Sequence, residues 1–126
     1  MSCPDCGGDR VTLRVPADLR DHAGSETVAV CRDCLRVQPI DAGAAEPATP
    51  SAVDESIPDG DGGVAFLLAC GKLGSLALHR PAIVELFEYA EAAGVDVYLT
   101  LDRLADTVPN PHFDVSRRME QVDEFL

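Results

Sequence analysis

The chain has few of the residues with which proteins hold polyanions and membranes. It contains no Trp, and only Lys72 among its 10 basic residues is a lysine, whereas 22 Asp and Glu residues set the formal charge at −12. Nonspecific binding to nucleic acid or to an anionic membrane needs clustered Lys and Arg, so this balance argues against both activities. An acidic, lysine-poor and Asp-rich composition is instead typical of a protein that stays soluble in multimolar salt.

Signals for catalysis and targeting are also missing. The glycines within 60–63 precede a helical pattern without the Lys and Ser/Thr of a phosphate-binding loop. His22, His79 and His112 are isolated, and no Ser, His and Asp set has a recognisable context, so we expect no enzyme. The apolar segment 64–78 contains a Lys and is too short to span a bilayer. No signal peptide is visible, and we expect a cytoplasmic protein without a membrane segment.

Charge and composition divide the 126 residues into three segments. Residues 41–63 carry acids but no base, are rich in Pro and Gly, and have Ile57 as their one large aliphatic residue. Such a segment cannot bury enough apolar surface to offset its ordering entropy. We therefore predict one domain at 1–40, an extended, self-repelling linker at 41–63 and a second domain at 64–126. The alternative for the middle segment is an ordered loop draped over a domain.

The period of the apolar residues differs between the two domains. Alternation at 11–15, 27–30 and 35–38 predicts three short antiparallel strands with one apolar face. Residues 64–78 are apolar nearly all round and predict a buried core helix, and Pro81 suits the first turn of a second helix.

Two further segments complete the second domain. Val95–Asp106 alternates as a strand would, but Asp96 could instead cap a helix, which we favour because no partner strand is near. Asp114 can cap a last helix. The predicted class is α+β: a small N-terminal three-stranded zinc ribbon, an acidic linker and a mostly helical C-terminal domain of about four helices.

The cysteines carry the sharpest chemical signal. Cys3-Pro-Asp-Cys6 and Cys31-Arg-Asp-Cys34 form two C-x2-C pairs, each next to a predicted strand. Each pair can place two sulfurs on one side of a tight turn, where backbone amides point at the thiolates, and Gly7 suits a turn that needs positive φ. Two such turns complete a tetrahedral four-thiolate site. The sequence therefore predicts one structural Zn²⁺ per chain, held by Cys3, Cys6, Cys31 and Cys34.

The cysteine pairs have three other interpretations. Disulfides fit poorly with a reduced cytosol and an odd fifth cysteine. A thioredoxin-like redox pair needs its cysteines at the start of a helix, whereas both pairs adjoin strand patterns. A rubredoxin-like iron centre is geometrically allowed, but the expected aromatic residues are missing. The fifth cysteine, Cys70, lies in the apolar helix and is expected to be a small buried residue.

Arginines make the predicted ribbon the least acidic part of the chain. One function for them is contact with phosphate or with an acidic partner, and the alternative is intramolecular pairing with nearby Asp residues. No aromatic residue lies in the ribbon, so stacking on single-stranded bases is not expected. The candidates for partner or phosphate contact are Arg10, Arg14, Arg32 and Arg36.

The motif Cys3-Pro-Asp-Cys6-Gly7, its partner Cys31-Arg-Asp-Cys34 and the acidic composition resemble the haloarchaeal small CPxCG-related zinc-finger proteins. The segments 75–80 and 93–104 also look like a haloarchaeal family of unknown function with a helical tail after such a ribbon. The second turn departs from the motif, because Leu35 stands where Gly would be. The resemblance implies a zinc-binding, cytoplasmic protein with a regulatory or adaptor role.

Three functional hypotheses follow. The first is a protein–protein interaction or regulatory module with a structural zinc site, in which the last helix could support homo-oligomers. The alternative is a nucleic-acid-associated zinc-ribbon factor related to transcription, against which the charge of −12 stands. A thiol redox enzyme is a third class and would leave the cysteine pairs free of metal.

Overall fold

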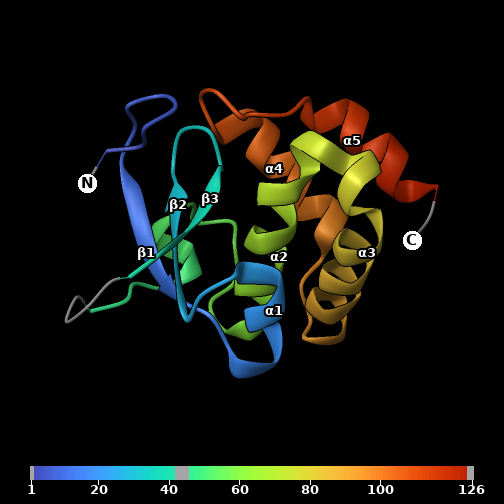
Figure 1. Cartoon of the computed structure of the whole chain (residues 1–126). Coiled ribbons are helices and arrows are strands. Elements are labelled where there is room, and N and C mark those ends of the chain that lie inside the picture. The colour runs from blue at the N-terminus through green and yellow to red at the C-terminus, as the bar shows by residue number, and fades with distance from the viewer. Residues whose placement is uncertain (1, 42–45, 125–126) are drawn as a thin grey trace.

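A three-stranded antiparallel sheet forms the N-terminal part of the computed structural model, which describes residues 2–41 and 46–124. The strands β1 (Arg10–Arg14), β2 (Thr27–Cys31) and β3 (Val37–Ile40) lie side by side in chain order (Figure 1). Leu13 pairs with Val28, and the register places alternating apolar side chains on one buried face. The predicted three strands are therefore confirmed.

Short helical turns connect β1 to β2, and the last strand begins later than predicted. The connection contains η1 (Ala17–Leu19) and α1 (Arg20–Ala23). The alternating pattern predicted a third strand from Leu35, but β3 starts at Val37. Leu35 has a φ of 65° and belongs to the turn that precedes the strand, so its apolar side chain packs into the core without strand geometry.

Four longer helices follow the sheet and occupy the other side of the molecule (Figure 1). These are α2 (Asp61–Lys72), α3 (Leu76–Ala92), α4 (Val97–Thr107) and α5 (Val115–Asp123), with a 3-10 turn η3 (Leu73–Ser75) between the first two. The α+β prediction is confirmed.

Side-chain caps explain where the last two helices begin. The carboxylate of Asp96 accepts a hydrogen bond from the Leu99 amide at 2.9 Å, and Asp114 accepts one from Arg117 at 3.1 Å. Each cap satisfies an amide that has no partner within its helix. The helical interpretation of residues 95–106 is thus confirmed, and the strand alternative is wrong.

The prediction that Pro81 begins a helix is wrong. Pro81 lies inside α3, five residues after its start at Leu76. Proline in a helix leaves the carbonyl four residues earlier without its donor, here that of Ala77. Both residues are exposed, so solvent can satisfy this carbonyl.

The described residues of the predicted linker, 41 and 46–63, are not one extended segment, because they include a 3-10 turn and the start of α2; residues 42–45 lie outside the described part of the chain. The Ala48 amide donates to the Thr12 carbonyl at 2.8 Å. A 3-10 turn, η2 (Pro50–Ala52), follows, and Val53 and Ile57 are buried. The alternative of an ordered loop is what the structure has. This segment cannot form a core alone, but its few apolar side chains fill a core that other elements supply.

Sheet, loop and helices share one cluster of buried apolar side chains. It joins Leu13 and Val28 of the sheet to Phe66 of α2 and Phe87 of α3, whose rings lie 5.9 Å apart. By length and composition alone the helical run Asp61–Ala92 could cross a membrane, but 61% of its most apolar window is buried inside the protein. This burial is what a core helix shows. The division into separate domains at residues 1–40 and 64–126 remains a prediction.

Candidate metal centre

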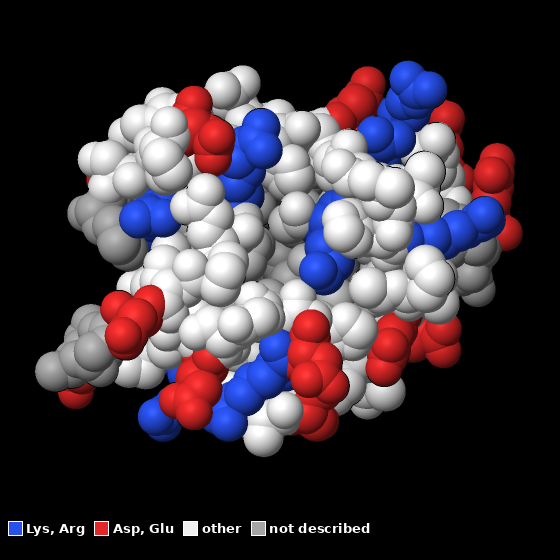
Figure 2. All heavy atoms as spheres, viewed as in Figure 1, with Lys and Arg blue, Asp and Glu red and all other residues white. Residues whose placement is uncertain are grey.

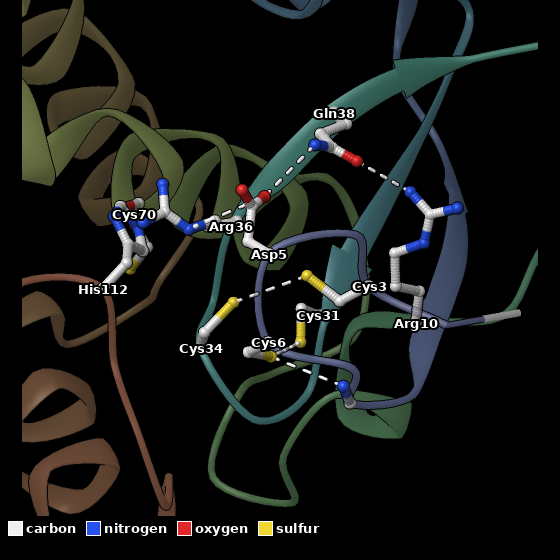
Figure 3. A network of polar contacts seen from close by, with 11 residues as sticks. Cys3, Asp5, Cys6, Arg10, Cys31, Cys34, Arg36, Gln38, Cys70 and His112 are labelled. Carbon is white, nitrogen blue, oxygen red and sulfur yellow. Dashed lines mark hydrogen bonds and ion pairs between the residues drawn. The ribbon is translucent and has the colours of Figure 1, made fainter.

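The two cysteine pairs meet at one end of the sheet (Figure 3). Cys3 and Cys6 lie in the turn before β1, Cys31 is the last residue of β2, and Cys34 lies in the turn before β3. The four sulfur atoms all lie within 4.8 Å of one another. The sulfurs of Cys3 and Cys34 are 3.8 Å apart, and those of Cys6 and Cys31 are 3.4 Å apart.

The two cysteine turns have the same backbone design. The Gly7 amide donates to the Cys3 carbonyl at 2.8 Å, and the Leu35 amide donates to the Cys31 carbonyl at 2.9 Å. Both donors have left-handed backbones, with φ of 78° at Gly7 and 65° at Leu35. Leu35 therefore takes the conformation that glycine adopts in the first turn, although a side chain makes this conformation costly. Its side chain is fully buried, which offsets that cost.

Backbone contacts hold the two turns together. The Arg32 amide of the second turn donates to the Asp9 carbonyl beside the first at 2.9 Å. Gly8 is buried, and a Cβ there would lie 2.8 Å from the Cβ of Asp33. Glycine at position 8 thus allows the close approach of the turns. The Gly8 amide also donates to the Cys6 sulfur at 3.4 Å, as expected where backbone amides stabilise a thiolate.

Burial and backbone hydrogen bonds shift the pKa of three of the four thiols. Cys3, Cys31 and Cys34 are at most 3% exposed, whereas Cys6 is exposed. Burial raises the pKa of Cys3, but hydrogen bonds from the Asp5 and Cys6 backbone amides outweigh it, so that the pKa falls to about 7. Burial raises the pKa of Cys31 and of Cys34 above the ordinary thiol value. Four thiolates in such a space repel one another, and a bound cation relieves this repulsion.

This donor set fits a metal ion. A tetrahedral ion with metal–sulfur bonds of about 2.3 Å has sulfur–sulfur edges of about 3.8 Å, close to the two separations given above. Cys3, Cys6, Cys31 and Cys34 would be its ligands. Four protein ligands leave no coordination position for water or substrate, so such an ion would stabilise the fold and would not activate a water molecule.

The remaining cysteine lies outside this cluster. Cys70 is fully buried in α2, and burial raises its pKa, as expected for an unreactive core thiol. Its backbone carbonyl lies 3.1 Å from Nε2 of His112. Among the described residues no histidine joins the sulfur cluster, and His22 lies instead 3.4 Å from the Glu85 carboxylate.

The four candidate arginines do not form one exposed stripe. The Arg10 guanidinium donates to the Gln38 side chain at 2.8 Å, the Gln38 amide donates to Asp5 at 3.5 Å, and Asp5 lies 3.8 Å from Arg36 (Figure 3). Arg10 and Arg36 therefore belong to one network across the sheet. Arg14 and Arg32 are exposed at other positions, the end of β1 and the second cysteine turn.

The loop between α4 and α5 contributes residues that the sequence did not reveal. Its Asn110 amide donates to the Asp33 carbonyl at 2.9 Å, and its His112 amide donates to the Cys34 carbonyl at 2.9 Å. The second cysteine turn is thus fastened to the helices through a segment about 75 residues away in the chain. No local pattern marks these backbone contacts, although the register of β2 and β3 could have placed Gln38 near Arg10.

Comparison with known proteins identifies a family but no function. Residues 2–126 match a family described as "Family of unknown function (DUF6276)". No curated protein and no solved structure matches the chain.

Proposed function

Since the chain belongs to this family of unknown function, we propose from the site itself that it is a protein–protein interaction or regulatory module held by one structural Zn²⁺. The observation that carries the proposal is the closed donor set of Cys3, Cys6, Cys31 and Cys34, with all sulfurs within 4.8 Å. A metal ion with four protein ligands stabilises the local structure and has no open coordination position for a reaction. Metal binding would therefore give the protein a rigid surface.

Zinc is the ion we propose because its preferences match the site. It takes four thiolates in tetrahedral geometry and needs no redox partner. Iron accepts the same ligands. The buried residues next to the cysteines within the two turns are Gly8 and Leu35, however, and neither is aromatic. A cytoplasmic location belongs to this proposal, since thiols stay reduced there.

The surface available to a partner is the first cysteine turn. Pro4, Asp5, Cys6 and Gly7 are all exposed, while the other three proposed ligands are buried. Metal binding fixes a turn that has few apolar contacts of its own, which lowers the entropy cost of recognition. The alternative, a nucleic-acid-associated factor, is disfavoured because Arg10 is engaged with Gln38 and the whole chain is acidic.

Co-purification from the native cells, with and without nuclease, tests the proposal. Three forms of the tagged full chain are compared: the wild type, Cys6→Ser, which removes a ligand, and Cys70→Ala, which removes a thiol outside the cluster. We expect a protein partner that survives nuclease with the wild type and Cys70→Ala but is lost with Cys6→Ser. The purified pair should then reassemble and protect residues 4–7 from hydrogen exchange. Loss of the partner on nuclease treatment, or equal recovery with Cys6→Ser, would contradict the module.

A further inference from the structure

Two adjoining cavities lie between β3 and the end of α2, each with a volume of about 200 Å³. Both are lined by Gly71, Lys72 and His79, so they are neighbours on one face of the protein. Figure 2 shows a hollow on this face between the sheet and the helices, with Lys or Arg side chains on both sides of it. We call this feature the basic groove.

The charge of the basic groove is opposite to that of the rest of the chain. Its lining includes the only lysine, Lys72, and all three histidines, His22, His79 and His112, together with Arg36. None of the described lining residues is Asp or Glu, although these make up 22 of the 126 residues. Lys72 and Arg36 are the permanent cations of this lining, and a concave site with such cations and no carboxylate focuses positive potential.

Part of this charge has no partner within the protein. Arg36 lies 3.8 Å from Asp5, and His22 lies 3.4 Å from Glu85, both just outside the lining. The side chains of Lys72 and His79 have neither a hydrogen bond nor an ion pair with any described residue. Figure 3 shows the Arg36 side chain extending from the sheet toward His112 on the helical side. The groove therefore has an unmatched ammonium group beside a guanidinium that only a long ion pair holds.

Glycines form the floor of the groove. A Cβ on Gly71 would lie 2.7 Å from the Cβ of Val37, and one on Gly74 would lie 2.9 Å from Nδ1 of His112. The sheet and the helices thus approach closely beneath a small space with polar walls.

We propose that the basic groove binds a small phosphate-type oxyanion, either inorganic phosphate or the phosphate group of a small soluble ester. Lys72 supplies the main charge, the Arg36 guanidinium offers a fork of N–H donors, and His79 offers a ring nitrogen. The volume of each cavity is below that of a typical drug-sized ligand site, which suits one such group. None of the four clustered cysteines lines this site, although Arg36 and His112 also contact the cysteine turns. Binding of an oxyanion here does not require the proposed interaction module.

Titration of the full, metal-loaded chain at low salt, followed by ¹H–¹⁵N spectra, tests the proposal. The probes are inorganic phosphate and glycerol 3-phosphate, with glycerol as the uncharged control. We expect saturable shifts at the amides of residues 71–75 and 79 with both phosphates and none with glycerol. Tighter binding of glycerol 3-phosphate would identify an ester as the source, and tighter binding of phosphate would identify the free ion.

Matched variants separate this site from general attraction to positive charge. Lys72→Gln removes one charge within the groove, and Arg117→Gln removes one charge from an exposed position on α5. We expect Kd to rise about tenfold or more for Lys72→Gln and to change less than twofold for Arg117→Gln, because a charge-assisted hydrogen bond is lost only in the first. Lys72→Arg should retain binding. The proposal is overturned by shifts scattered over the surface, by no saturation, or by equal effects of the two Gln variants.

Discussion

The left-handed conformation of Leu35 predicts an unusual order of stabilities. Leu35 is fully buried and has a φ of 65°. Substitution by Ala removes core contacts worth about 2–5 kcal/mol and keeps the backbone cost. Substitution by Gly removes the same contacts but relieves the cost of the left-handed backbone, about 1–2 kcal/mol. Part of this gain, about 0.4–1 kcal/mol, is lost because Gly gives the unfolded chain more conformational freedom. Leu35→Gly should therefore be more stable than Leu35→Ala by about 0.5–1 kcal/mol.

Leu13 provides the matched control because it is equally buried but lies in the regular strand β1. There Gly should be less stable than Ala by about 0.5–1 kcal/mol. The free energy of unfolding is measured in urea for all four variants with zinc in constant excess. The reasoning is refuted if Gly is worse than Ala at both positions, since the turn would then gain nothing from glycine.

Three more predictions address cooperativity, capping and pH. Because the sheet and helices share a core, Cys31→Ser should increase hydrogen exchange in α2 as well as in the sheet, and unchanged protection of α2 would indicate independent domains. Asp96→Ala should lower the unfolding free energy by about 0.5–2 kcal/mol through loss of the cap, and the exposed Asp102→Ala on the same helix by less than about 0.5 kcal/mol. Burial raises the pKa of Asp54, but hydrogen bonds from Ser56 outweigh this and hold the pKa below its ordinary value. The contribution of Asp54 to stability is thus present above its ordinary, unfolded-state pKa and is lost as the pH falls through its lower pKa in the folded protein. Asp54→Asn should reduce the loss of stability below about pH 4 in acid titrations, and an unaltered acid profile would contradict this.

The sequence predicted best those features that short patterns encode. The spacing of the cysteine pairs predicted the cluster of four sulfurs. Asp96 and Asp114 predicted helix starts, because a capping side chain acts on an amide within three residues. The alternation through Leu35 was misleading, since a buried side chain can reach the core from a turn as well as from a strand.

Long-range packing was not visible in the sequence. Ile57 and Val53 lie in a segment too polar to fold alone, and their burial depends on a core formed by distant residues. The basic groove likewise combines His22, Lys72 and His112, which no spacing connects. Such sites arise only when the sheet packs against the helices, so local composition cannot predict them.

The metal content of the purified full chain, measured by native mass spectrometry together with thiol titration, tests the central claim most directly. The account predicts one zinc ion per chain, which is released as the thiols of Cys3, Cys6, Cys31 and Cys34 are modified, while buried Cys70 stays unreactive until the protein unfolds. A folded chain without metal, with the four clustered thiols freely reactive or joined in disulfides, would contradict the account.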